Sequence, residues 1–451
     1  MLKMIPANKP ELLAPGGNLQ KALTALRFGA DAVYVGGTAF GLRAAAGNLT
    51  DAEMQKLLAF AHANDKKVYV TLNILPRSRE IAPLCRYAAE LQELGVDGAI
   101  VADLGAFLAL RREVPDLPLH VSTQANNLNA DTCRFWADQG AVRINLAREL
   151  ELSEIREIGD ALSAAYGSSA PGLEVFVHGA MCMAYSGRCM LSDYLTGRSS
   201  NRGECAQPCR WQYTLTPGTD PASKPVPASA SAPYLLAASM TEEKRPGQVF
   251  GVEETGEGTF LFNSKDLCLL PYLHEVIGAG ASALKIEGRM KSDFYVGVTV
   301  RAYREAIDRV WDSLSSGGSG ELDPATLARL IDEVSSVSHR DYSDGFLHGG
   351  RGEQVYGTSS YIRNSVYAGL VEACSAEVDG YRLTVSQRGN FGVGETLEFV
   401  QPSGPVLRLP LAAMTDSEGQ SIDRAAHACM TVLIRAPFPV EAGSIARVRK
   451  P

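Results

Sequence analysis

The sequence predicts an α/β fold, a TIM-like (β/α)8 barrel followed by a small C-terminal β-barrel domain. Over the first three hundred residues, short β-branched apolar runs alternate with longer amphipathic runs, which is typical of parallel strands joined by helices. A glycine repeatedly follows a helical run and precedes a strand. After about residue 360 the pattern changes to short alternating strands separated by turn residues.

Eight segments are expected to form the strands of the barrel: 11–15, 32–37, 67–73, 98–103, 119–125, 143–149, 174–180 and 283–288. The runs between them, such as 19–30, 51–65 and 82–95, have apolar residues at helical spacing. Glycine enters the left-handed backbone conformation at little cost, so it suits the end of a helix. We therefore expect helices to end at Gly29, Gly95, Gly140 and Gly280.

Polar side chains recur at the ends of these strands. In a (β/α)8 barrel the reactive face forms at the C-terminal strand ends, and buried polar groups there need partners or a ligand. A hydrogen bond that only shapes the barrel mouth is the alternative explanation for each of them. The residues concerned are Asn73, Asp103, Gln124, Asn126, Asn145, Arg148, His178 and Glu287, while Glu11 begins the first strand. The candidates for catalysis are His178, Glu287, Asn73 and Gln124, and His178 lies four residues before Cys182.

Four of the nine cysteines lie in one glycine- and arginine-rich window, residues 180–212. They follow the pattern C-x6-C-x15-C-x3-C, which matches neither common zinc ribbons nor the bacterial ferredoxin run. Four thiolates suit an iron–sulfur cluster or a structural zinc, and a disulfide is a third reading. The four are Cys182, Cys189, Cys205 and Cys209; the isolated Cys85, Cys133, Cys374 and Cys429 are expected to be small buried residues.

This window, together with PELLAPGGN, FNSKDL and LKIEGRMKS, resembles the peptidase U32 family. The resemblance implies a [4Fe-4S] cluster, whose first three cysteine ligands map onto Cys182, Cys189 and Cys205. In one branch of the family the fourth maps onto Cys209. Cys268 is the competing fourth ligand, although it falls in a run that we expect to begin a helix.

The resemblance also implies a function. Several members hydroxylate their substrates, and the chain is most similar to the branch that converts tRNA wobble uridine to 5-hydroxyuridine with prephenate as oxygen donor. Hydroxylation of rRNA cytidine or of a quinone precursor is an alternative, as is a U32-type, collagenase-like peptidase. The sequence has neither an H-E-x-x-H helix nor a G-x-S-x-G elbow, which gives the peptidase little chemical support. A non-catalytic protein that carries a cluster is the third class.

The net charge of −8 argues against a protein that coats nucleic acid by bulk electrostatics. Binding of tRNA would then require a local basic face. Arg188, Arg198, Arg202 and Arg210 lie in the cysteine window, and Lys285, Arg289 and Lys291 lie in LKIEGRMK. For a dicarboxylate such as prephenate the expected cations are Arg148, Lys285 and Arg289, while Arg188 and Arg210 are further candidates for substrate binding. Solvated or salt-bridged cations are the simpler reading.

The expected domains are a barrel over 1–300, a helical connector over 301–355 and a C-terminal domain over 360–451. The Pro-, Ala- and Ser-rich segment 216–238 predicts a mobile surface insertion. No apolar run is long enough to span a membrane, so we expect a cytoplasmic protein with reduced cysteines. A redox cofactor also needs an electron source, for which a donor protein is one candidate. The sequence does not indicate an oligomeric state.

Overall fold

A computed structural model describes residues 6–41, 47–182, 184–211, 264–350 and 361–450. It also describes the backbone of four short strands, β8 (Ala238–Glu242), β9 (Arg245–Val252), β10 (Glu254–Thr255) and β11 (Gly258–Thr259). Apart from Ala238, which begins β8, the segment predicted to be a mobile insertion lies outside the described residues.

The barrel contains eight parallel strands, and each coincides with a predicted segment. Strand β13 pairs with β1 on one side and with β7 on the other, which closes the sheet. Nearly every position of these strands is buried, as parallel strands with helices outside require. The strands are β1 (Glu11–Gly16), β2 (Ala32–Val35), β3 (Lys67–Leu72), β4 (Gly98–Val101), β5 (Leu119–Val121), β6 (Arg143–Asn145), β7 (Gly172–Ala180) and β13 (Ala281–Ile286).

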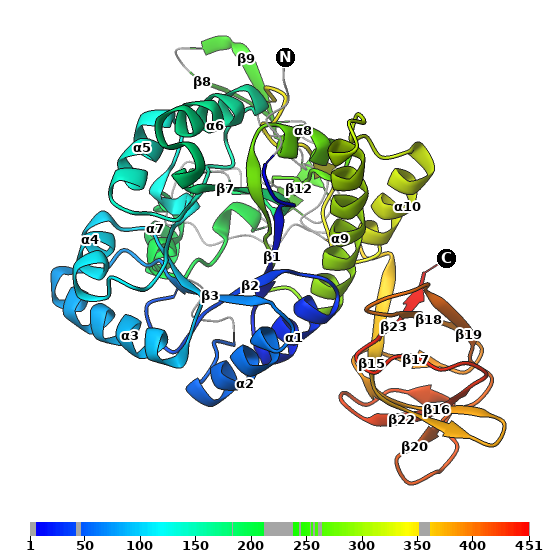
Figure 1. The fold of residues 1–451 in the computed structure, drawn as a ribbon. Helices are drawn as coiled ribbons and strands as arrows, with labels where there is room; N and C mark the ends of the chain where they lie inside the picture. The colour runs from blue at the N-terminus through cyan, green and yellow to red at the C-terminus, as the bar shows by residue number, and fades with distance from the viewer. Residues whose placement is uncertain are drawn as a thin grey trace.

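Helices surround the barrel (Figure 1). Gly29, Gly95, Gly140 and Gly280 have positive φ angles, which confirms the predicted glycine signals before the strands. The outer helices are α1 (Leu19–Arg27), α2 (Asp51–His62), α3 (Ile81–Leu94), α4 (Leu104–Glu113), α5 (Ala130–Asp138), α6 (Leu152–Tyr166), α8 (Leu273–Gly278) and α9 (Asp293–Ser315). Short 3-10 turns are η1 (Ser78–Glu80), η2 (Thr123–Ala125), η3 (Gly167–Ser169) and η6 (Leu270–Tyr272). Within the described part of the chain, no helix combines the length and apolarity that crossing a membrane takes.

A short strand, β12 (Asp266–Cys268), extends the sheet at the C-terminal end of β7. It runs antiparallel to β7, with Cys268 opposite His178, and parallel to β14 (Tyr342–Ser343). The expectation that Cys268 begins a helix is therefore wrong. The apolar run around it did not reveal that the end of β7 offers unpaired backbone groups, which β12 satisfies.

Helix α9 crosses the predicted domain boundary at residue 300, since it spans Asp293–Ser315 without a break. Its buried face packs on α1 and on the barrel, and α10 (Pro324–Ser335) packs beside it. The barrel unit therefore includes α9 and α10. Figure 1 shows the C-terminal domain next to α9 and α10.

The C-terminal domain is an antiparallel sheet with the order β19-β18-β23-β15-β16-β22-β20. Among the described residues no ladder joins β19 to β20, so hydrogen bonds do not close the predicted small barrel. The strands are β15 (Ser365–Glu377), β16 (Gly380–Gln387), β18 (Thr396–Val400), β19 (Leu407–Pro410), β20 (Thr415–Asp416), β22 (Thr431–Ala436) and β23 (Ile445–Arg449); β17 (Phe391–Gly392) pairs separately with β21 (Arg424–Ala425).

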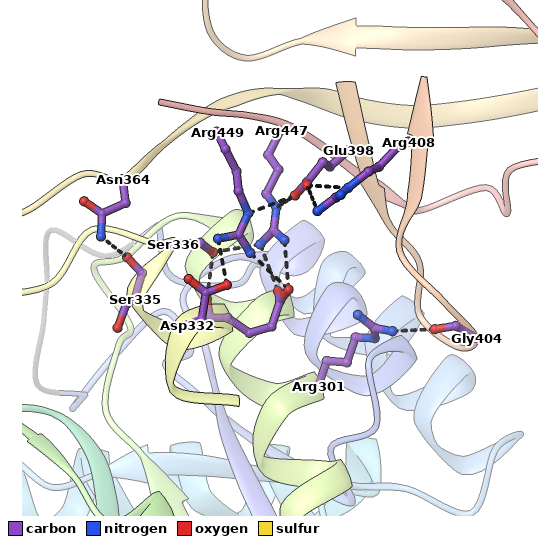
Figure 2. A network of polar contacts seen from close by, with 11 residues as sticks. Arg301, Asp332, Ser335, Ser336, Asn364, Glu398, Gly404, Arg408, Arg447 and Arg449 are labelled. Atoms are coloured by element: carbon purple, nitrogen blue, oxygen red, sulfur yellow. Dashed lines mark hydrogen bonds and ion pairs between the residues drawn. The ribbon is translucent and has the colours of Figure 1, made fainter. Parts of the chain in front are cut away.

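A buried ionic network joins this domain to α10 (Figure 2). The fully buried guanidinium of Arg447 donates to Glu398 at 2.8 Å and to Glu333 at 2.9 Å, and Arg449 contacts the same two carboxylates. Ile445 of β23 also reaches α9, where Gly297 leaves room for it; a Cβ at Gly297 would lie 2.5 Å from Ile445. The two domains therefore share packing as well as charge.

Candidate functional site

Four predicted polar residues meet at the barrel mouth. The Asn73 amide donates to Gln124 Oε1 at 3.0 Å, which joins the ends of β3 and β5. On the other side, Glu287 Oε2 lies 3.2 Å from the Tyr34 hydroxyl and 3.8 Å from Arg148 Nη2. Arg148 also donates to the Ala180 carbonyl and covers the ring of Phe176. The mouth therefore presents amide, carboxylate and guanidinium groups that come from different strands.

Other polar residues have structural roles. Asp103 caps α4 by accepting from the Ala106 amide at 2.9 Å. Asn145 is buried below the mouth. Glu11 lies at the opposite end of the barrel, where it binds Arg143 and the Tyr69 hydroxyl. For Asp103 and Glu11 the simpler reading, a contact that shapes the barrel, is the one that the structure supports.

The cysteine loop, residues 181–211, leaves the end of β7 and rests on the mouth. Asn126 donates to the Ser186 carbonyl at 3.0 Å and accepts from Arg188 Nε at 2.6 Å. Gly187, with a positive φ, lies so close to Gln124 that a Cβ there would be 2.8 Å from the Gln124 carbonyl oxygen. The loop contains the short helix α7 (Leu191–Thr196) and the 3-10 turns η4 (Ser200–Arg202) and η5 (Pro208–Arg210).

Arg202 fixes the far side of the loop to the barrel. Its guanidinium pairs with Glu80 at 2.7 Å and donates to the Leu75 carbonyl at 3.0 Å. This ion pair and the hydrogen bond from the Arg77 backbone lower the pKa of Glu80 to about 2. Nothing in the sequence marked Glu80 as the partner, because the two residues are far apart along the chain.

The loop carries all four of these cysteines. Burial raises the pKa of the Cys209 thiol, Arg210 lowers it, and the thiols of Cys182, Cys205 and Cys189 raise it further. The Cys205 sulfur accepts a hydrogen bond from the Gln207 amide at 3.4 Å.

Arg210 links the two parts of the loop that carry these cysteines. Its guanidinium donates to the carbonyl of Met181, which precedes Cys182, and to the side chain of Gln207, each at 3.2 Å. The cation is therefore close to both Cys182 and Cys209, and those thiols contribute to the raised pKa of Arg210. It is placed to balance negative charge on bound thiolates.

Thiolates are ligands that zinc and iron–sulfur clusters share. Among the residues that the structure describes, no three Cys, His, Asp or Glu side chains are arranged to hold one metal ion.

Cys268 lies apart from these four cysteines. It is fully buried, 3.8 Å from the Tyr303 hydroxyl, and burial raises the pKa of its thiol to about 11. His178 lies in the same buried cluster, with Nδ1 3.3 Å from the Tyr303 hydroxyl. The rings of Tyr295, Tyr303 and Tyr342 enclose it, and burial lowers its pKa to about 3. An enclosed neutral histidine has no access to substrate, so its position does not support the catalytic role predicted for it.

Two predicted substrate-binding cations are also buried. Lys285 lies inside the barrel, with Nζ 2.7 Å from Glu174 Oε1. Arg289 joins strand-end loops through Asn48 at 2.8 Å and Thr71 at 3.4 Å. Both side chains have protein partners and are almost inaccessible, so their positions do not support a role in holding a donor.

Lys291, next in the same motif, lies beside the cysteine loop. Its ammonium is 4.0 Å from the centre of the Tyr361 ring, and Arg210 donates to the Tyr361 hydroxyl at 3.4 Å. Burial lowers the pKa of Lys291 to about 8, while Asp266 opposes that change. Asp266 forms a buried ion pair with Arg340 at 2.7 Å. Sequence reasoning missed Asp266 and Tyr361, although Asp266 stands in the FNSKDL motif.

Comparison with known proteins identifies the family. A model described as "Peptidase family U32" matches residues 17–356, and a model of the U32 C-terminal domain matches residues 363–447. The chain belongs to peptidase family U32. The relatives of this chain are named for different activities. The tRNA hydroxylation protein P of Escherichia coli is 33% identical over 96% of this chain and 95% of its own length.

Two further U32 relatives are informative. A 23S rRNA 5-hydroxycytidine synthase of Escherichia coli is 33% identical and covers 77% of this chain and 47% of its own length. A protein named collagenase, from Porphyromonas gingivalis, is 30% identical and covers 80% of each chain. The relatives of this chain thus include proteins named for RNA hydroxylation and for proteolysis.

Proposed function

We propose that this U32 protein is an RNA-modifying enzyme, an iron–sulfur-dependent hydroxylase of a pyrimidine in RNA. The observation that carries the proposal is the loop with four cysteines that rests on a polar barrel mouth. The RNA substrate follows from the relatives named for tRNA and rRNA hydroxylation. Within this class we favour tRNA wobble uridine as the target and prephenate as the oxygen donor.

Cys182, Cys189, Cys205 and Cys209 would hold a [4Fe-4S] cluster. When bound, it would supply one-electron redox chemistry at the mouth. The Gln207 amide and Arg210 would stabilise negative charge on the ligands. Zinc at these cysteines is the alternative.

The polar groups at the mouth would orient the reactants. A dicarboxylate donor needs cations; Arg148 remains a candidate because it lies at the mouth, and Lys291 takes the place of the buried Lys285 and Arg289. Asn73 and Gln124 can exchange hydrogen bonds with the edge of a pyrimidine, which offers both donors and acceptors. Glu287, held by Tyr34 and Arg148, is placed to accept a proton.

Proteolysis has less support from the site. His178 and Cys268 lie opposite each other on paired strands, but both are buried, so this pair offers no accessible nucleophile. Peptidase activity remains the second candidate function because one relative is named collagenase.

The test combines iron analysis with nucleoside mass spectrometry. Anaerobically reconstituted protein should be brown and contain about four irons per chain. Cys205→Ser should lose the colour, and Cys268→Ser is the matched control that should keep it. In a strain lacking the gene, wild type and Cys268→Ser should restore 5-hydroxyuridine-type nucleosides in tRNA, whereas Cys205→Ser should not.

Two results would contradict the proposal. One is a colourless, zinc-containing protein after anaerobic reconstitution. The other is an unchanged nucleoside profile in a deletion strain that has no second family member. Collagen cleavage that survives Cys205→Ser would favour the peptidase.

A further inference from the structure

The cysteine loop exposes a large share of the apolar side chains that lie on the surface. Among the described residues thirteen large hydrophobic side chains are exposed, and five of them fall between residues 185 and 211. Tyr194 is 85% exposed and Met190 69% exposed. The other three are Tyr185, Leu195 and Trp211. Concentrated apolar exposure next to a reactive centre is typical of a binding surface.

Hydrogen bonds inside the loop hold these side chains on a fixed backbone. Ser192, buried in α7, donates to the Arg198 carbonyl at 2.7 Å and accepts from the Ala206 amide at 2.9 Å. The Trp211 indole donates to the Ala206 carbonyl at 3.1 Å. The exposed rings of Tyr194 and Trp211 are therefore carried by parts of the loop that are bound to each other.

Two exposed arginines of the loop are available for an anionic partner. Within the described structure, neither Arg188 nor Arg198 forms an ion pair, and the Arg188 side chain donates to the neutral Asn126. Exposed arginines elsewhere differ: Arg112 pairs with Glu113, and Arg435 with Glu377. Residues 185–211 contain four arginines but only two carboxylates, whereas the whole chain has a net charge of −8.

We propose that this surface, formed by Tyr185, Tyr194, Trp211, Arg188 and Arg198, binds the unpaired bases and phosphates of an RNA loop. Aromatic rings and guanidinium groups stack on unpaired bases, and such bases are the ones that proteins read in RNA. The Arg188–Asn126 contact connects the surface to the barrel mouth, which a target base must enter. The inference rests on the proposed function and assigns the surface of the protein to which the RNA substrate binds.

Binding of a fluorescent RNA stem–loop to the anaerobically reconstituted full chain tests the inference. Tyr194→Ala should weaken binding about 5- to 100-fold, the range expected for loss of one base stack. Tyr194→Trp should retain the affinity. Phe135→Ala, which removes an exposed ring from α5, is the matched control and should leave it unchanged. A fully paired RNA duplex should bind more weakly and respond little to Tyr194→Ala.

The role of the loop arginines in binding phosphates is tested by the salt dependence of RNA affinity. Arg198→Gln should lower the slope of log affinity against log salt by about one, whereas Arg112→Gln on α4 should not change it. Iron content and thermal unfolding, measured for every variant, show whether the loop is intact.

Three outcomes decide between the possibilities. If the wild type binds and hydroxylates RNA but a Tyr194→Ala, Arg198→Gln double variant binds it equally well, the docking inference is wrong and the proposed function stands. If the double variant binds RNA normally but accepts electrons more slowly from a ferredoxin- or flavodoxin-type protein, the surface serves that protein instead. If the iron-loaded wild type neither binds nor modifies RNA, the proposed function itself fails.

Discussion

At the residue scale, burial separates the polar side chains that can take part in chemistry from those that hold the fold. His178 and Glu287 both lie at the ends of barrel strands, and the position of His178 four residues before Cys182 favoured a catalytic role for it. In the structure, tyrosines from α9 and β14 cover His178, whereas Glu287 stays at the mouth beside Arg148. The covering residues lie more than a hundred positions away along the chain.

Replacement of His178 tests this assignment through the pH dependence of stability. The pKa of His178 is about 3 in the folded protein and about 6.5 when the chain is unfolded. Between pH 6.5 and pH 3 the imidazole of His178 is therefore protonated in the unfolded chain but not in the folded protein. Below pH 6.5 the free energy of unfolding should fall by about 1.4 kcal/mol per pH unit from this residue alone.

The variant His178→Phe should remove that contribution, because a phenyl ring does not titrate and can occupy the space between the tyrosines. Urea unfolding at pH 7 and pH 5 should then show a smaller loss of stability for the variant than for the wild type. An equal loss of stability in both proteins would mean that water reaches His178 in the folded protein. His178 would then again be a candidate for catalysis.

At the scale of elements, the cysteine loop depends on how closely it approaches the barrel. Arg202 fixes one side of the loop to Glu80, and Gly187 rests against Gln124 on the other. Gly187 and Gly197 both have positive φ angles in this loop, but no atom lies within 4 Å of a Cβ built at Gly197. A side chain at either glycine would strain the backbone, but only at Gly187 would it also collide with neighbouring atoms.

We expect Gly187→Ala to disturb the loop more than Gly197→Ala. Each variant should cost roughly 1–2 kcal/mol of backbone strain, and only Gly187→Ala also pushes against the Gln124 backbone. Reconstituted Gly187→Ala should hold less iron and be cleaved faster by protease within the loop. Equal iron contents in the two variants would show that the contact with Gln124 does not matter for the cysteines.

At the scale of the whole molecule, buried charges fix the C-terminal domain against the barrel unit. Arg447 is fully buried between Glu398 of the sheet and Glu333 of α10, whereas Arg408 reaches the same Glu398 with a side chain that is 72% exposed (Figure 2). Removing one member of a buried pair leaves an uncompensated charge, while loss of an exposed pair has little effect.

Arg447→Met should therefore lower the free energy of unfolding by about 3–5 kcal/mol, and Arg408→Met by less than about 1 kcal/mol. Denaturant unfolding of both full-length variants measures the difference. We also expect protease to separate the two domains faster in Arg447→Met. Indistinguishable stabilities would show that water enters the network and that apolar contacts such as Ile445 with α9 hold the domains together.

The sequence by itself determined the barrel strands, the antiparallel C-terminal strands and the clustering of the cysteines. Those features depend on local chemistry: apolar runs form strands, glycine ends helices, and four cysteines share one loop. Only the tertiary structure decided that α9 runs unbroken across residue 300, that Cys268 and His178 are buried together, and that Lys285 pairs with Glu174 inside the barrel. Each of these facts depends on partners from distant segments, and a single sequence does not record which segments come to cover which.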